Sequence, residues 1–172
     1  IQHEEGASRG AFVIQRDGRR IAEMTYTRTN PTLVVVDHTF VDPSLRGQGV
    51  ARELQDAMVA WARELQVGVH LRANQLAGLV ARPLEQGAPV AASCHTPEDL
   101  RQAEALGCDF AVVGSVHPTL SHPGGEALGW HGFARLREGA SLPIYAIGGM
   151  AAADIEDARR HGAQGIAAIR GL

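Results

Sequence analysis

The stretch from Leu33 to Leu54 restricts the fold more than any other part of the chain. It opens with an apolar, β-branched run, so Thr32–Val41 is predicted to be a buried strand. The glycine-rich segment 46–51 follows and leads into an amphipathic helix expected from about Gln48 to Leu65. Because the first N–H groups of a helix lack partners within it and carry partial positive charge, such a unit can bind phosphate groups. Alternatively, the glycines can serve only the geometry of a tight strand-to-helix turn.

Two shorter strands precede this unit and should pair with its strand. Ala11–Gln15 and Arg19–Thr27 are separated by Asp17-Gly18, a two-residue hairpin signal because both residue types tolerate positive φ. Asn30-Pro31 marks the next turn. The N-terminal part is therefore expected to be an antiparallel β-meander with the helix on one face.

From Val67 onwards, short apolar strands alternate with helical stretches. The strand candidates are Val67–Leu71, Val90–Ser93, Phe110–Gly114, Ile144–Ile147 and Gly165–Ile169. The helical candidates lie near Asn74–Glu85, Pro97–Leu106, Trp130–Glu138 and Ala152–His161. This alternation predicts a five-stranded parallel sheet, so the chain is assigned to the α/β class, as a meander and helix joined to a parallel βα half-barrel.

Active residues in parallel sheets gather at the C-terminal ends of the strands, and several polar residues fall there. Gly148-Gly149 can hold a phosphate on backbone N–H groups, or can serve only as a tight turn. Cys94-His95 can be a nucleophile with a neighbouring base, or Cys94 can be a buried structural thiol. The long loop 115–128 is typical of a functional lid.

Histidines supply two further hypotheses. His38 follows Asp37 just before the glycine turn and is a candidate general base for deprotonating an amine. Strand alternation predicts that one residue of this pair lies in the core and the other outside. Five more histidines can meet at strand ends as metal ligands, although their loose spacing favours ordinary surface or loop positions: His70, His95, His117, His122 and His131.

Composition excludes several classes of function. The 172 residues allow one domain or two small ones, and the net charge of −3 predicts no general affinity for nucleic acid or anionic membranes. No apolar run approaches a membrane span, and the first residues do not resemble a signal peptide. Two cysteines, Cys94 and Cys108, do not form a disulfide framework, so a reducing, cytoplasmic compartment is expected.

The run "GAFVIQRDGRRIAEMTYTRTNPTLVVVDHTFVDPSLRGQGVARELQDAMVAWAR" resembles the small, compact members of the GCN5-related N-acetyltransferase superfamily. The resemblance implies acetyl-CoA as cofactor, with the strand before the glycine turn holding its pantetheine arm. Its pyrophosphate would bind the backbone amides of Arg46, Gly47, Gln48, Gly49, Val50 and Ala51. The family's next strand leads to a cysteine, whereas Arg72 follows Leu71 here.

The segments "VGVHLRANQL", "VAASCHTPEDL", "DFAVVGSVHPTLSHPGG", "PIYAIGGM" and "GIAAIRGL" resemble the C-terminal part of a thiamine-phosphate synthase or its relative, the TenI thiazole tautomerase. The nearest likeness is to the synthase-like domain that follows a Nudix domain in some bacterial proteins. The resemblance implies phosphate contacts from Gly148 and Gly149, and substrate contacts from Ser93, Thr119 and Ser121.

The chain departs from this second family in its metal and diphosphate sites. The family's lysine is replaced by His122, and its magnesium-binding aspartate falls near Asn74 or Gln75. The tautomerase histidine is Ser115, with His117 close by. The first three βα units, which would carry the diphosphate-binding residues and the other metal ligand, are absent. No magnesium site is therefore expected.

Together the two resemblances predict a chimera, with a truncated acetyltransferase-like segment at 1–66 and a TIM-barrel-like half-barrel at 67–172. Three hypotheses follow: acetyl-CoA-dependent acetyl transfer to an amine, binding of a phosphorylated thiazole or pyrimidine, and a natural or engineered fusion without catalytic activity. Because five parallel strands cannot close a barrel and exposed strand edges invite pairing, the protein is expected to form a homo-oligomer.

Overall fold

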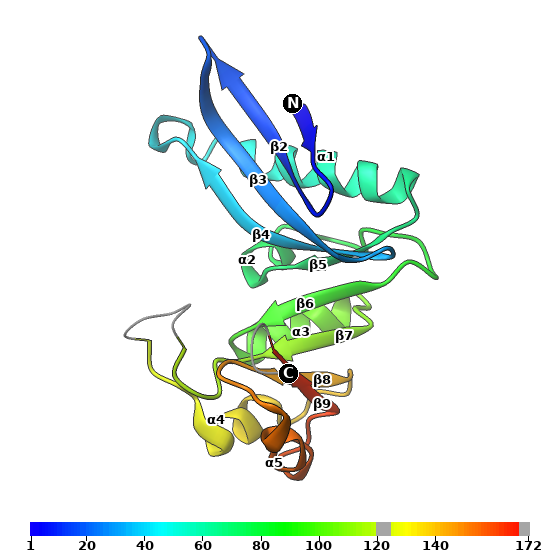
Figure 1. The fold of residues 1–172 in the computed structure, drawn as a ribbon, viewed down its shortest axis with the longest axis vertical. Helices are drawn as coiled ribbons and strands as arrows, with labels where there is room; N and C mark the ends of the chain where they lie inside the picture. The colour runs from blue at the N-terminus through cyan, green and yellow to red at the C-terminus, as the bar shows by residue number, and fades with distance from the viewer. Residues whose placement is uncertain (120–124, 169–172) are drawn as a thin grey trace. The chain divides into compact units, whose positions relative to one another are not determined.

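The structure, a computed structural model, describes residues 1–119 and 125–168 (Figure 1). The chain forms two compact units. Unit 1 holds Ile1–Leu71 and Arg82–Val90, and unit 2 holds Arg72–Ala81 and Ala91–Leu172. Both units combine strands with helices, which confirms the predicted α/β class.

Unit 1 is built on a sheet in the order β1-β2-β3-β4-β5. Its strands are β1 (Gln2–Glu5), β2 (Arg9–Arg16), β3 (Arg19–Asn30), β4 (Leu33–Val41) and β5 (Gly68–Leu71). The first four run antiparallel, which confirms the meander, and β5 runs parallel to β4. Asp17 and Gly18 adopt φ of 51° and 74° between β2 and β3, as the predicted hairpin requires.

The helix that follows the glycine turn, α1 (Val50–Glu64), packs on one face of this sheet (Figure 1). Leu54, Met58 and Ala62 are fully buried and follow one another at four-residue spacing, so they form the apolar stripe of the helix. After the helix, the N–H of Val67 donates to the carbonyl oxygen of Ala62 at 3.0 Å. This bond closes the C-terminus and turns the chain into β5.

Unit 2 contains a parallel sheet whose strands are joined by helices. The strands pair in the order β6 (Val90–Cys94), β7 (Phe110–Val113), β8 (Ile144–Ile147) and β9 (Gly165–Ala167). The helical segments are α2 (Ala73–Leu76), α3 (Pro97–Ala105), α4 (Gly129–Leu136), η2 (Ala152–Asp154) and α5 (Ile155–Arg160). The predicted parallel βα region is thereby confirmed.

Local capping contacts define both ends of α3. The Thr96 hydroxyl accepts the Asp99 N–H at 3.1 Å, and the Asp99 carboxylate accepts the Thr96 N–H at 2.9 Å. At the other end Gly107 adopts φ 69°, and the Cys108 N–H reaches the Ala103 carbonyl at 2.9 Å. The helix therefore begins with a reciprocal cap and ends at a left-handed glycine.

The helix expected near Asn74–Glu85 is wrong in its extent, because α2 ends at Leu76. The Gln102 side chain of α3 donates to the carbonyl oxygens of Leu76 and Leu79 at 3.4 and 3.2 Å. These carbonyl oxygens therefore have hydrogen-bond partners without a further helical turn. A longer helix would also need the N–H of residue 83 for the Leu79 carbonyl, and Pro83 has no N–H.

The two faces of the unit 2 sheet carry different residues. The register places Cys94, Val113 and Ala146 side by side on one face, and each is fully buried. Ser93 lies on the opposite face, in a row that also holds Tyr145. Because adjacent strand residues alternate, Ser93 and Cys94 cannot serve the same site.

Candidate functional site

The glycine turn at the start of α1 has exposed backbone donors. Gly47 and Gly49 adopt φ of 77° and 82°, and a Cβ at either position would meet no atom within 4 Å. The Gly49 carbonyl accepts the Arg52 N–H at 2.9 Å. Within residues 1–119 and 125–168, the N–H groups of Gly47, Gly49, Val50 and Ala51 donate no backbone hydrogen bond outside regular helix pairing. The turn can therefore accept an anion.

Asp42 holds the chain in place just before this turn. Its carboxylate accepts the N–H and the hydroxyl of Ser44 at 3.0 and 2.7 Å and so caps the short helix η1 (Pro43–Leu45). These hydrogen bonds lower the pKa of Asp42, and Arg46 is among the cations that lower it further. The Gln48 side-chain amide donates to the Ser44 carbonyl at 2.9 Å, and this hydrogen bond stabilises the turn.

Among the described strands, one edge of β4 is unpaired along the part of the strand that leads to the glycine turn. The pairing of β4 with β5 covers Leu33–Val35, opposite Gly68–His70. In the part of the chain that the structure describes, Val36–Val41 pairs with β3 alone. An unpaired strand edge presents N–H and C=O groups, so an extended ligand arm can lie along β4 and end at the turn.

A β-bulge overturns the predicted alternation of Asp37 and His38. His38 pairs with Thr25 and Val36 pairs with Tyr26, so Asp37 is an extra residue in β4. Both Asp37 and His38 are exposed, whereas alternation placed one of them in the core. The bulge thus presents two polar side chains next to each other.

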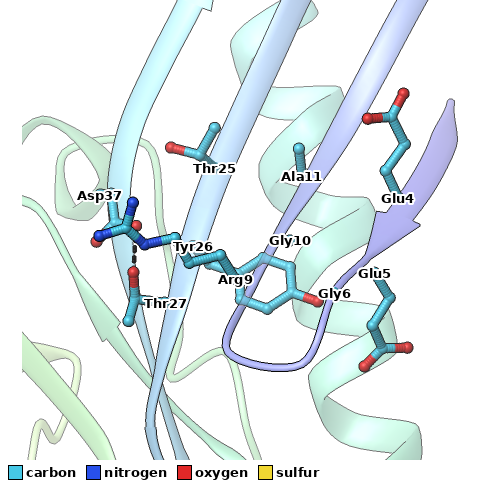
Figure 2. Close-up of a pocket in the computed structure, with 10 residues that line it drawn as sticks. All are labelled: Glu4, Glu5, Gly6, Arg9, Gly10, Ala11, Thr25, Tyr26, Thr27 and Asp37. Carbon is cyan, nitrogen blue, oxygen red and sulfur yellow. Dashed lines mark hydrogen bonds between the residues drawn. The ribbon is translucent and has the colours of Figure 1, made fainter.

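A pocket of about 580 Å³ opens on unit 1 beside this bulge (Figure 2). The Thr27 hydroxyl donates to the Asp37 carboxylate at 2.6 Å at its edge. No motif in the sequence predicts this pocket, because its residues are spread over four strands. The lining residues are Glu4, Glu5, Gly6, Arg9, Gly10, Ala11, Thr25, Tyr26, Thr27 and Asp37.

In unit 2, the glycine pair after β8 packs tightly against the segment that follows β7. Gly148 and Gly149 adopt φ of 101° and 66°. A Cβ on Gly148 would lie 2.6 Å from the Ser115 Cα, and one on Gly149 would lie 2.8 Å from the His117 Cβ. The His117 N–H donates to the Gly148 carbonyl at 3.0 Å. Close packing therefore explains both glycines, and the phosphate contacts remain a prediction.

His117 lies against the glycine pair with its ring held by neighbours. Its Nε2 is 3.5 Å from an Asp154 carboxylate oxygen, and its ring meets Trp130 edge-on at 5.6 Å between centroids. The other oxygen of Asp154 accepts the Ala151 N–H at 2.8 Å. The sequence suggested His117 as a neighbour of Ser115 and as one of five possible metal ligands, but no local pattern indicated its pairing with Asp154.

The remaining predicted residues of unit 2 are placed as follows. Thr119 is half-buried, and Ser121 lies outside the described residues. Cys94 is fully buried, and burial chiefly raises the pKa of its thiol to about 12. The thiol therefore stays protonated at neutral pH, which contradicts the hypothesis of a Cys94 nucleophile. His95 instead contacts the Gly114 carbonyl oxygen through Nδ1 at 2.9 Å.

The histidines do not converge on a metal site within residues 1–119 and 125–168, where no group of three or more potential ligands forms. Among the predicted ligands, His122 lies outside the described residues. None of the helices in the described part of the chain is long and apolar enough to cross a membrane.

His70 on β5 should make unit 1 sensitive to acid. It is 8 % exposed, and burial lowers its pKa from 6.5 to about 4. The neutral ring therefore stabilises the fold fully above pH 6.5, and this contribution is lost as the pH falls towards 4. We expect the loss to approach about 3 kcal/mol in unfolding free energy.

Urea unfolding between pH 4 and 7 measures this contribution, with His70→Asn compared against His38→Asn. His38 is a matched control, because its replacement removes an exposed histidine from the same unit. An unchanged slope in His70→Asn would contradict the prediction.

An antiparallel meander with a glycine turn, followed by parallel βα units, defines a two-part α/β protein. The chain belongs to the thiamine monophosphate synthase family, whose model matches residues 46–172. The model of the acetyltransferase (GNAT) family matches residues 1–81. Both predicted resemblances are confirmed, and the two matches overlap across α1 and β5.

Similar proteins include thiamine-phosphate synthases from Salinispora arenicola, 36% identical over 107 residues, and Caldivirga maquilingensis, 32% identical over 111 residues. Each alignment covers 61% of this chain and 51% of the relative, so the chain spans about half the length of these curated relatives. A solved thiamine phosphate pyrophosphorylase from Pyrococcus furiosus is 20% identical, with a TM-score of 0.41 over 68% of this chain and 64% of that chain.

Proposed function

We propose that unit 1 is an acetyl-CoA-binding, N-acetyltransferase-like module, fused to a half-barrel that binds a phosphate group. The main support is that a row of backbone N–H groups follows an unpaired strand edge. The N–H groups of Gly47, Gly49, Val50 and Ala51 follow β4 and η1, and among the described strands one edge of β4 is unpaired from Val36 onwards. A ligand with a pyrophosphate and an extended amide-bearing arm matches this arrangement.

The residues of unit 1 would then have separate roles. The glycine turn, from Arg46 to Ala51, would hold the pyrophosphate, and the open edge of β4 would hold the pantetheine arm. Acetyl-CoA supplies an activated acyl group that is transferred directly to an amine. His38, exposed beside the bulge, would take the proton that the amine loses. Most of the rate enhancement would come from positioning the two reactants.

Thermal unfolding and light scattering of the full chain, with and without CoA, test this proposal. A ligand present at 100 times its dissociation constant should stabilise the folded state by about 2.7 kcal/mol. Pantetheine and adenosine 3′,5′-bisphosphate, the two halves of CoA, should each stabilise less than CoA. A dimer that is indifferent to CoA would overturn the proposal.

A second candidate function, binding of a phosphorylated thiazole or pyrimidine, is favoured by the glycine pair of unit 2. In the described part of the chain, the N–H groups of Gly149 and Met150 make no backbone hydrogen bond outside regular strand pairing. They lie at the C-terminal edge of the parallel sheet, where ligands of such sheets bind. Ser93, Thr119 and Ser121 remain the proposed substrate contacts.

A pair of ligands that differ only in their phosphate tests this second function without a mutation. We expect thiazole phosphate to shift the backbone amide resonances of Gly149 and Met150, and the corresponding thiazole alcohol to leave them unchanged. Heteronuclear NMR of the labelled chain measures both. Shifts of equal size with the two ligands, or none with either, would contradict a phosphate site at this turn.

We also propose that the protein is a cytoplasmic homo-oligomer. The first strand, β1, pairs on one side only, with β2, among the described strands. Open strand edges favour pairing between chains. If the fusion has no activity, oligomerisation alone would account for its stability. A melting temperature that rises with protein concentration would support assembly, and one that stays constant would contradict it.

A further inference from the structure

The pocket beside the bulge is separate from the proposed CoA contacts and calls for a ligand of its own. We propose that it binds an α-amino acid through both its carboxylate and its amine, and that this amino acid is the acetyl acceptor. The acceptor role rests on the proposed acetyltransferase function, whereas the binding does not. The volume of about 580 Å³ lies within the range of small-molecule sites.

Arg9 is the group in the pocket that is suited to a carboxylate. Its exposed guanidinium lines the pocket and makes no hydrogen bond or ion pair with any residue in the described part of the chain. The nearby Arg20 and Arg28, by contrast, pair with Glu4 and Glu5. A guanidinium without a protein partner offers its planar fork of donors to a ligand carboxylate, which it can bind through two hydrogen bonds.

Asp37 is the group suited to the ammonium of the same ligand. The bulge places it at the pocket, and the Thr27 hydroxyl fixes one carboxylate oxygen at 2.6 Å. A carboxylate accepts several hydrogen bonds, so an ammonium can bind there in addition to the partners that Asp37 already has. Glu4 and Glu5 already face arginines, and Figure 2 shows their carboxylates turned away from Asp37. Asp37 therefore makes the principal contact with the amine.

The position of Asp37 along β4 fits acetyl transfer. An amine held there lies next to His38 and on the strand whose open edge leads to the glycine turn. In the transfer the bound ammonium first loses a proton to His38 or water. The nitrogen of the resulting amine then forms a bond to the acetyl carbon and releases a second proton to water. The carbon–sulfur bond breaks, and the sulfur leaves as a thiolate that takes up a proton.

Calorimetric titration of the full chain without CoA tests the binding step. The probes are L-leucine, L-leucinamide, which lacks the carboxylate, and N-acetyl-L-leucine, which lacks the amine. We expect L-leucine to bind more tightly than either analogue. Arg9→Gln should weaken L-leucine at least tenfold and leave L-leucinamide nearly unchanged. Arg16→Gln is the matched control, because Arg16 is exposed on the same strand but does not line the pocket.

Asp37→Asn should weaken L-leucine and L-leucinamide to the same degree, and thermal melts of each variant verify folding. Absence of L-leucine binding, equal binding of L-leucine and L-leucinamide, or equal effects of Arg9→Gln and Arg16→Gln would overturn the proposal. The two proposals fail separately. If the protein binds CoA but no amino acid, the proposed role of this pocket is wrong. If it binds an amino acid through Arg9 but does not bind CoA, the proposed acetyltransferase function is wrong.

Discussion

Gly49→Glu is expected to reduce the affinity of unit 1 for CoA at least about 100-fold, which corresponds to about 2.7 kcal/mol. Gly49 caps α1 in the left-handed conformation at φ 82°, with open space where a side chain would start. A glutamate there would place its carboxylate where the pyrophosphate is proposed to bind. It would also offset the partial positive charge of the helix N-terminus, so electrostatic repulsion would replace attraction.

The matched control is Gly139→Glu. Gly139 adopts φ 83°, its Cβ would also meet no atom within 4 Å, and it belongs to unit 2. Both variants carry the same strain of about 1–2 kcal/mol for a left-handed residue with a side chain. Calorimetry with CoA separates the two effects, because only Gly49→Glu should lose binding. Equal CoA affinity in the two variants would contradict the proposed pyrophosphate site.

Leu54→Ala is expected to destabilise unit 1 by about 2–5 kcal/mol. Leu54 is fully buried on the face of α1 that packs against the sheet. Truncation removes apolar contacts and leaves a cavity that the surrounding strands can fill only partly. Urea unfolding followed by the fluorescence of Trp61, in a Trp130→Phe background, measures unit 1 because Trp61 is then the remaining tryptophan.

Leu65→Ala provides the control, since it removes the same atoms from the end of the same helix. Leu65 is 48% exposed, so its truncation should change the unfolding free energy by no more than about 0.5 kcal/mol. Similar losses in the two variants would show that α1 is not anchored through its buried stripe.

Local sequence signals were sufficient for most of the elements. The hairpin at Asp17-Gly18 depends on two residues that adopt positive φ, and the start of α3 depends on reciprocal bonds between Thr96 and Asp99. The strand β1 had no such signal, because its residues are polar and exposed. It forms because it pairs with β2 and because His3 stacks on Phe12, with ring centroids 4.3 Å apart.

The candidate site also has parts that local sequence signals predict and parts that they do not. The glycine turn could be predicted because its chemistry lies in six consecutive residues whose backbone does the binding. The bulge at Asp37 could not, because it arises from the register between β4 and β3. The pairing of His117 with Asp154 and the pocket around Arg9 depend on residues that are distant in the chain.

The sequence by itself determined the α/β class, the meander, the glycine turn with its helix and the alternation of parallel strands with helices. Each of these follows from hydrophobic periodicity, capping or turn chemistry, which act over a few neighbouring residues. Only the tertiary structure decided the short α2, the exposure of both Asp37 and His38, the buried and protonated Cys94, and the pocket. Those features arise from strand register and from packing between distant segments, where the energy of a residue depends on partners that its neighbours in the chain do not specify.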